Sequence, residues 1–247
     1  MLKYVYIVFH AILDLLLAMV VFIPIRLIKV FKHEPFDQWA YSEKSNSTTA
    51  IVLVHGSGVN EAQFIPARRI LTRLAGSDLR VYSCDLNAKG SYQSNPAESI
   101  ETYAARLEYY IRQNVLTQKT DKLVLVGHSM GGLVAGFLID RLPINLLVTI
   151  GTPWQGAKAL KWVYGYPGFN TERHKQMSPG SDFLRKLKEK VKNAKVQLMT
   201  IGCEFDFQVL EHDAHLWIDN EILYSTYTGH ISAIILENLW RTVLKQI

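Results

Sequence analysis

The stretch KLVLVGHSMGGLVAGFLIDRL, Lys122 to Leu142, decides the fold class. It begins with a β-branched apolar run typical of a buried strand and ends with apolar residues at helical spacing. Between the two lies a serine with three glycines around it: Ser129, Gly127, Gly131 and Gly132. The pattern is G-x-S-x-G, placed after a strand and before a helix. We interpret it as a tight strand-to-helix turn that exposes the serine hydroxyl, with glycines where side chains would clash.

The rest of the chain alternates short apolar runs with amphipathic stretches. Six runs are typical of strands: Ala50–Val54, Leu79–Cys84, Lys122–Val126, Leu146–Ile150, Val196–Ile201 and Ile222–Thr226. Helical spacing recurs over Glu61–Leu74, Ala97–Val115, Met130–Arg141 and Asp182–Lys192. This alternation predicts an α/β fold, with a mostly parallel sheet of about six core strands and helices on both faces.

Composition and charge restrict the class of protein. The chain has 247 residues, of which 49% are hydrophobic and 20% charged, as expected for one globular domain with a sizeable core. Its net charge of +5 is modest and comes with no nucleic-acid motif, so we expect no nucleic-acid partner. Two cysteines, Cys84 and Cys203, make no disulfide framework and are predicted to be buried free thiols. No metal-ligand spacing stands out, so we predict no metal and no cofactor.

An apolar segment, Tyr4–Ile25, opens the chain and is long enough to cross a bilayer, which takes about 20 residues. Because it has no small-residue cleavage site, we predict an uncleaved anchor, in a bacterial inner membrane. His10 and Asp14 oppose a clean span, although at a spacing of four they share one helix face and could satisfy each other. We prefer a spanning helix over a helix lying in the interface, with a buried globular helix as the third alternative. Flanking basic residues do not fix the side of the membrane.

The sequence divides into three parts. Residues 1–40 form the anchor and juxtamembrane segment, 41–49 a polar linker, and 50–247 the catalytic domain. Within the domain, residues 154–180 are rich in aromatic residues and glycine and break the strand–helix rhythm. We interpret this insertion as a lid over the site, with an ordinary surface loop as the alternative.

The motifs resemble the α/β-hydrolase superfamily, and within it bacterial lipases and esterases, from about Ala50 to Leu244. IVLVHGSG, Ile51 to Gly58, looks like the first core strand and oxyanion loop of that family, and GHSMGG looks like its nucleophile elbow. TIGTPWQGA, Thr149 to Ala157, resembles the Thr-Pro-His-x-Gly stretch of lipases, with Trp154 in place of the histidine. The resemblance implies an α/β-hydrolase fold, and the apolar N-terminal helix predicted above precedes it.

A serine hydroxyl becomes nucleophilic when a histidine, oriented by a carboxylate, takes its proton. In this fold the chain order is Ser, acid, His, which assigns Ser129 as nucleophile. His230 is the expected base, because it stands in a Gly-His pair between the last strand and the last helix. Asp206 is the expected acid, with Glu204 as the alternative. Glu211 and Asp213 are weaker candidates for the acid. The other histidines after Ser129 are interpreted as surface residues: His174, His212 and His215.

The resemblance also implies an oxyanion hole made by two backbone N–H groups, those of Ser57 and Met130. Gly56 and His55 precede the first of these, and His55 is expected to brace the loop rather than to react. His128, next to the nucleophile, is also interpreted as structural.

These assignments predict a membrane-associated serine hydrolase that cleaves carboxylic esters of lipids or other apolar acyl groups. Thioester hydrolysis and acyl transfer use the same machinery, and the sequence does not separate them. Peptidase or peroxidase chemistry and a non-catalytic membrane-tethered binding protein are further alternatives. The oligomeric state is not predicted.

Overall fold

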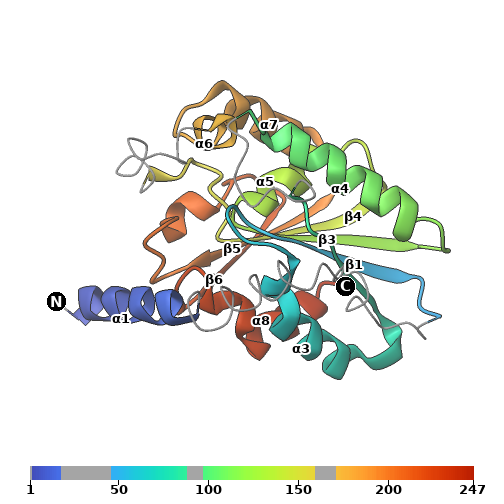
Figure 1. The fold of residues 1–247 in the computed structure, drawn as a ribbon, viewed down its shortest axis with the longest axis horizontal. Helices are drawn as coiled ribbons and strands as arrows, with labels where there is room; N and C mark the ends of the chain where they lie inside the picture. The colour runs from blue at the N-terminus through green and yellow to red at the C-terminus, as the bar shows by residue number, and fades with distance from the viewer. Residues whose placement is uncertain (1, 18–45, 88–96, 159–170) are drawn as a thin grey trace, which may run out of the picture.

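The computed structural model describes residues 2–17, 46–87, 97–158 and 171–247 (Figure 1). Its centre is a six-stranded sheet in which every neighbouring pair is parallel. The strands are β1 Thr49–Val54, β2 Arg80–Ser83, β3 Lys122–His128, β4 Ile144–Ile150, β5 Gln197–Cys203 and β6 Glu221–Thr226. All six predicted strands are present, and the predicted parallel α/β fold is confirmed. β1 begins one residue earlier than predicted, because Thr49 pairs with Lys122 instead of belonging to the linker; residues 41–45 lie outside the described ranges.

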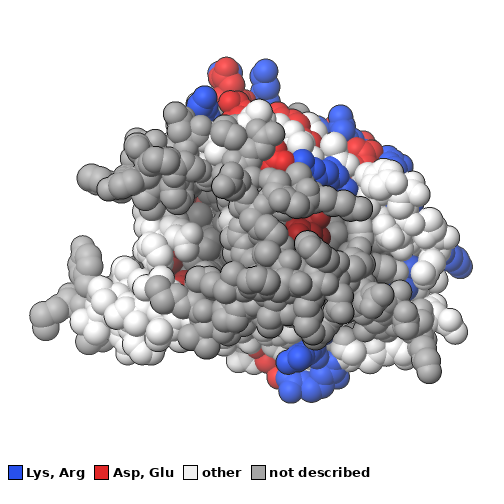
Figure 2. Space-filling view, in the orientation of Figure 1, with Lys and Arg blue, Asp and Glu red and all other residues white. Residues whose placement is uncertain are grey.

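The N-terminal helix α1 spans Leu2–Leu17 and lies at the left of Figure 1. Within the described residues no helix is long and apolar enough to cross a membrane, so the predicted spanning helix is not found there. The rest of the predicted span, residues 18–25, is outside the described part. His10 and Asp14 do not satisfy each other as expected, because the Asp14 carboxylate accepts backbone N–H groups of the domain. The part of α1 that is coloured on the visible face in Figure 2 is white, without charge.

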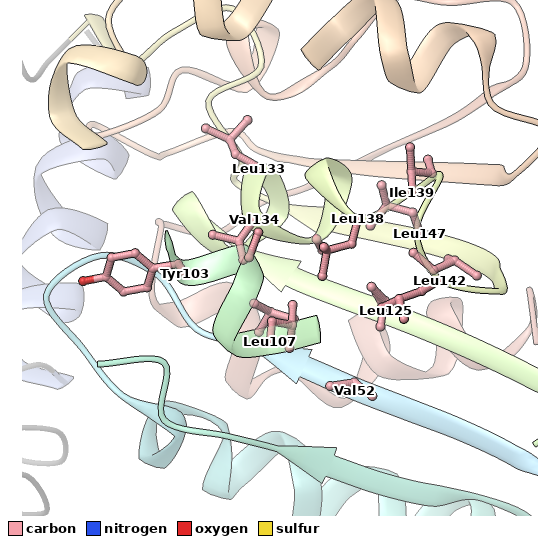
Figure 3. Close-up of a cluster of buried hydrophobic side chains, with 14 of the residues drawn as sticks. Val52, Tyr103, Leu107, Leu125, Leu133, Val134, Leu138, Ile139, Leu142 and Leu147 are labelled. Carbon is pink, nitrogen blue, oxygen red and sulfur yellow. The ribbon is translucent and has the colours of Figure 1, made fainter. Parts of the chain in front are cut away.

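Helices cover both faces of the sheet, as predicted. α4 Ile100–Asn114, α5 Met130–Phe137 and α7 Asp182–Asn193 lie on one face, and α3 Ile65–Ala75 and α8 Glu237–Leu244 on the other (Figure 1). Figure 3 shows the first layer, where Leu107 of α4 and Val134 of α5 pack over Val52 and Leu125. Neighbouring strand residues such as Ile51 face the second layer. The sheet is therefore buried on both sides, as parallel sheets are.

Local capping sets where the helices begin. Ser99 accepts a hydrogen bond from the Thr102 N–H, so α4 starts at Ile100 rather than at the predicted Ala97. Ser181 caps α7 in the same way, one residue before its first turn. The predicted helix over Glu61–Leu74 begins as a short 3-10 helix, η3 Glu61–Phe64, and continues as α3.

The order of the strands is β2-β1-β3-β4-β5-β6. From β1 the chain moves outward to β2, and from β3 onward it moves to the other side of the sheet. Ligands of open parallel sheets bind at the carboxyl ends of the strands where the order reverses in this way. That point lies between β1 and β3, which are followed by residues 55–58 and by Ser129.

The predicted lid, residues 154–180, is only partly described, since residues 159–170 lie outside the described ranges. Trp154 does not belong to a surface lid: its side chain is fully buried and its indole N–H donates to the Thr149 hydroxyl at 3.0 Å. A Cβ on Gly136 of α5 would lie 2.8 Å from this ring, so the indole packs directly beneath α5. After the gap, α6 Glu172–Gln176 packs near the start of α4, where Gln176 accepts from the Ile100 N–H at 2.7 Å.

Candidate active site

Ser129 occupies the turn between β3 and α5 in a conformation that is rare for a residue with a side chain. Its φ is 55° and its ψ is −128°. Such backbone angles cost free energy and occur mostly at functional sites, where the surroundings hold them. Here the Ser129 N–H donates to the Ile150 carbonyl at 2.8 Å, and the Thr152 hydroxyl donates to the Ser129 carbonyl at 3.0 Å. The turn is therefore held by the last residue of β4 and by the segment that follows this strand.

The glycines around this serine are required because neighbouring segments approach them too closely for a side chain. A Cβ on Gly127 would lie 2.4 Å from the Gly132 Cα, and one on Gly131 would lie 2.2 Å from the Val54 carbonyl oxygen. A Cβ on Gly132 would lie 2.0 Å from the Thr152 hydroxyl oxygen. Because real Cβ atoms do not approach other atoms so closely, β3, α5 and the end of β1 can meet only through glycine.

His230 and Asp206 form a buried pair at the carboxyl ends of β6 and β5. The His230 Nδ1 lies 2.5 Å from the Asp206 Oδ2, and both side chains are almost fully buried. The other oxygen, Oδ1, accepts from the backbone N–H groups of Gln208 at 2.7 Å and Val209 at 2.9 Å. These bonds fix the carboxylate, which in turn fixes the imidazole with Nε2 as its free nitrogen.

The electrostatics of His230 favour its protonated form. Burial acts to lower its pKa, but the charge of Asp206, the hydrogen bond to Asp206 and the charge of Asp14 together raise the pKa above the ordinary value. The acid therefore stabilises the imidazolium that proton transfer would create.

Two of the other three sequence candidates for the acid, Glu211 and Asp213, have carboxylates that bind other side chains. Glu211 accepts from the Ser225 hydroxyl at 2.5 Å and contacts the His215 Nε2 at 3.2 Å. Asp213 pairs with Lys158 at 2.8 Å. Glu204, the alternative acid, donates its backbone N–H to the Thr226 carbonyl at 2.9 Å. Asp206 is the carboxylate found at hydrogen-bond distance from the His230 ring.

The residues after β4 bring Ser129 and the His–Asp pair together. Ile150 accepts from the Ser129 N–H, and Gly151 follows it with a φ of 54°. A Cβ on Gly151 would lie 3.1 Å from the His230 Nδ1 and 3.3 Å from the Asp206 Oδ2. The three predicted site residues therefore converge on Ile150–Gly151, at the carboxyl ends of β3, β5 and β6.

The loop after β1 lies against the nucleophile. A Cβ on Gly56 would lie 3.0 Å from the Ser129 Cβ, which leaves no room for a side chain beside the serine. His55 holds this loop: its Nε2 accepts from the Leu86 N–H at 2.9 Å, so its Nδ1–H donates to the Gly56 carbonyl at 2.8 Å. Ser57 comes next in this loop, and Met130 is the first residue of α5, whose first N–H groups have no partner within the helix.

His128 does not have the environment of a base. It is fully buried, and burial, reinforced by the neighbouring His230 and His55, lowers its pKa to about 3, although its bond to the His230 carbonyl acts the other way. A neutral ring donates from Nε2 to the His230 carbonyl at 2.9 Å and accepts from Gln63 at Nδ1, 3.4 Å away. His128 therefore holds the backbone of His230. The sequence shows that His128 is next to the serine, but it contains no pattern that predicts the hydrogen bond of His128 to the His230 carbonyl.

Two of the three histidines interpreted as surface residues are buried instead. His174 bonds through its Nδ1 to the Thr171 hydroxyl at 2.8 Å. His215 bonds to the Thr200 hydroxyl at 2.6 Å. His215 also has Glu211 within 3.2 Å of its Nε2, while His212 is exposed beside Trp217. Within the described residues no group of His, Cys, Asp and Glu could hold a metal ion.

The residue near the site that sequence reasoning missed is Asp14 of α1. Its carboxylate accepts from the Ile231 N–H at 3.0 Å and from the Ser232 N–H at 2.8 Å, directly after His230. The two segments are 217 residues apart, and an acidic residue in an apolar helix gives no sign of its distant partner.

The chain matches one family model, described as the alpha/beta hydrolase family, over residues 51–218. No curated protein matches it. Among solved structures, a lipase-esterase related protein from Clostridium acetobutylicum is 16% identical, with a TM-score of 0.62, and covers 82% of this chain and 96% of its own. The mature lipase BlEst2 of Bacillus licheniformis is 16% identical, with a TM-score of 0.63, over 83% and 94%. The RedJ thioesterase of Streptomyces coelicolor is 14% identical, with a TM-score of 0.54, over 82% and 91%.

Proposed function

The chain belongs to the alpha/beta hydrolase family, and from that premise we propose that it is a serine hydrolase that cleaves carboxylic esters of lipids or other apolar acyl groups. The observation that carries the proposal is the buried His230–Asp206 pair, which lies against Gly151, next to the Ile150 carbonyl that holds the strained Ser129 turn. A hydroxyl, an imidazole and a carboxylate in this order supply the nucleophile, the base and the residue that orients the base.

In the first half of the reaction, the Ser129 hydroxyl oxygen attacks the ester carbonyl carbon while the His230 Nε2 takes its proton. The tetrahedral intermediate collapses, the bond to the alcohol oxygen breaks, and the imidazolium returns the proton to the leaving alcohol. In the second half, His230 takes a proton from water, whose oxygen attacks the acyl carbon. The bond to the Ser129 oxygen then breaks, the imidazolium returns the proton to that oxygen, and the carboxylic acid leaves. Asp206 stays ionised throughout and stabilises the imidazolium of both steps.

The negative oxygen of the tetrahedral intermediate needs preorganised donors, and losing one such donor typically costs about 10²–10³ in kcat. The backbone N–H groups of Ser57 and Met130 take this role in the proposal. Gly56 supports it, because the loop that carries Ser57 approaches Ser129 so closely. The positive end of the α5 helix dipole lies at the same place.

The proposal includes association with a membrane, which the outer face of α1 would contact. Six apolar side chains on this helix are more than half exposed: Val5, Val8, Phe9, Ile12, Leu15 and Leu16. A contiguous apolar face of this kind suits a helix that lies in the plane of a membrane interface, here that of a bacterial inner membrane. The opposite face is engaged by the domain through Asp14, which favours a helix lying on the bilayer over one crossing it.

Thioester hydrolysis is the second candidate function. The likeness to the RedJ thioesterase favours it, and the same triad performs it with a thiol as leaving group. The membrane face of α1 is common to both candidates, since acyl thioesters and lipid esters both carry apolar chains.

A substrate panel tests the proposal. Purified protein is assayed with p-nitrophenyl esters and acyl thioesters of increasing chain length, with Ser129→Ala and, as a matched control, the exposed Ser225→Ala. We expect ester hydrolysis that increases beyond butyryl and is lost only in Ser129→Ala. Faster turnover of thioesters at every length would favour the second candidate, and hydrolysis of neither class would contradict both.

A further inference from the structure

Asp14 is a buried carboxylate whose partners are the backbone of the loop that carries His230. Asp14 is only 1% exposed. A charge buried in this way is tolerated when hydrogen-bond donors surround it. Oδ1 accepts from the Ser232 N–H at 2.8 Å and Oδ2 from the Ile231 N–H at 3.0 Å. Bonds from N–H groups to an ionised carboxylate are stronger than bonds between neutral groups.

The residue on the other side of His230 also touches this carboxylate. A Cβ on Gly229 would lie 2.5 Å from the Asp14 Oδ2, so the loop can close around the carboxylate only with glycine there. The Gly229 N–H donates to the Ser232 hydroxyl at 3.0 Å, which closes the loop on itself. Asp14 thus fills the inside of the turn formed by residues 229–232.

The backbone of His230 is therefore held from two sides. His128 donates to its carbonyl at 2.9 Å, and Asp14 binds the next two N–H groups. The rotation of the imidazole about its own bonds is fixed by Asp206, but the position of its Cα depends on these backbone contacts. An error of about 1 Å in the placement of a reacting group can cost about 10²-fold in rate.

The same face of α1 reaches the loop of the acid. Tyr6 and His10, which precede Asp14 at helical spacing, both stack on Phe205, with ring centroids 5.3 Å and 4.8 Å from it. Phe205 is the residue before Asp206. One helix face therefore contacts the segments that present both the acid and the base.

We propose that Asp14 is a positioning residue for the His230 base, and that α1 is part of the active-site framework as well as a lipid-binding helix. The inference rests on the serine-hydrolase function proposed above. Asp14 does not contact the reacting atoms in this account; it acts through the backbone of the turn and through its charge.

In the described part of the chain, Asp206, Asp14 and His128 act on or lie beside the His230 ring, and Cys203 lies near the two carboxylates. His128 and Cys203 are neutral, since burial lowers the pKa of the first, and burial together with the charge of Asp206 raises the pKa of the second. The charges that act on His230 are then those of Asp206 and Asp14, and both raise its pKa. Removing the charge of Asp14 should lower that pKa.

The test is Asp14→Asn, which keeps the size of the side chain and removes its charge, with the exposed Asp121→Asn at the opposite end of β3 as the matched control. We expect kcat on the best ester to fall about tenfold to a hundredfold, with KM little changed. The acid limb of kcat/KM should move to lower pH, which a merely structural role would not cause. Asp121→Asn should match the wild type in both respects.

An NMR titration of the His230 imidazole gives a readout that does not depend on turnover. We expect a lower midpoint in Asp14→Asn than in the wild type. If the wild type hydrolyses no ester, the proposed function fails, and the titration still decides whether Asp14 acts on His230. A folded Asp14→Asn protein with wild-type kcat and an unmoved titration midpoint would overturn the inference. If Asp14→Asn does not fold, the smaller neutral variant Asp14→Ser takes its place under the same criteria.

Discussion

The imidazole of His128 donates to the backbone carbonyl of His230, 102 residues further along the chain, at 2.9 Å. This bond links the strand that presents the serine to the loop that presents the base. In the proposed mechanism the two adjacent residues of the GHS motif therefore have different roles: Ser129 is the nucleophile, and His128 supports the backbone of the base.

His128→Ala should reduce kcat by about tenfold to a hundredfold without abolishing hydrolysis, because it removes a support of His230 and not the base itself. With a pKa of about 3, His128 should also contribute no step to the pH–rate profile above pH 4. Steady-state kinetics of His128→Ala from pH 4 to 9 checks both points. Complete loss of activity in a folded protein would indicate that His128 has a chemical role.

Asp206→Asn should lower kcat on the order of 10⁴-fold, because the amide no longer stabilises the imidazolium and favours the wrong tautomer of His230. Glu204→Gln, a matched change two residues away, should retain most of the activity. Measured kcat values for the two variants decide between the acids. Should Glu204→Gln be the damaging change, the assignment of Asp206 is wrong.

Activity should be lost on acidification at a pH above the ordinary histidine pKa of 6.5. The base must be neutral to accept the serine proton, and Asp206 and Asp14 outweigh burial to raise the pKa of His230. As pH falls through this raised pKa, the imidazole becomes protonated and kcat/KM declines. A pH profile of kcat/KM with an acid-limb midpoint at or below 6.5 would contradict this electrostatic description.

Gly132→Ala should destabilise the fold by about 1–3 kcal/mol, the usual cost of overpacking, because its Cβ would lie 2.0 Å from the Thr152 hydroxyl. Adding Thr152→Ala removes the atoms in closest contact and should recover part of that loss. Chemical denaturation of both variants measures the free energy of unfolding. Equal destabilisation with and without Thr152→Ala would show that the contact is not the cause.

Charge on the outer face of α1 should weaken binding to lipid. The double variant Val8→Lys, Ile12→Lys replaces two side chains that are 57% and 53% exposed, so the fold should tolerate it. Sedimentation with zwitterionic vesicles should show reduced binding, because apolar contact is lost and no anionic lipid compensates. Tyr109→Lys, an exposed aromatic residue on α4, is the control and should bind like the wild type.

The order of elements could be predicted from the sequence because each strand and helix has its own local pattern. All six strands lie within a few residues of the predicted ranges, and Ser129 falls on the predicted turn, since G-x-S-x-G is a local signal. His230 and Asp206 are predicted from their positions after strands and from the family resemblance, and the topology of the fold brings the two side chains together at one edge of the sheet.

The burial of Trp154 and the partners of Asp14 could not be predicted from the sequence, because both depend on contacts with other segments of the folded chain. Trp154 falls in a stretch that looks like a lid, yet its indole finds a buried hydroxyl partner on Thr149. Asp14 falls in a segment that looks like a membrane span, and only the folded chain brings it to Ile231 and Ser232. Apolar composition alone does not distinguish a helix that packs on a protein from one that enters a bilayer.

The most direct test of the central claim is covalent labelling of the nucleophile by a fluorophosphonate, followed by intact-protein and peptide mass spectrometry. We expect one adduct per chain, located on Ser129, together with complete loss of ester hydrolysis. Ser129→Ala should take up no label, and Ser225→Ala should be labelled like the wild type. A labelled residue other than Ser129, or an unlabelled wild-type protein, would contradict the claim that Ser129 is an activated nucleophile.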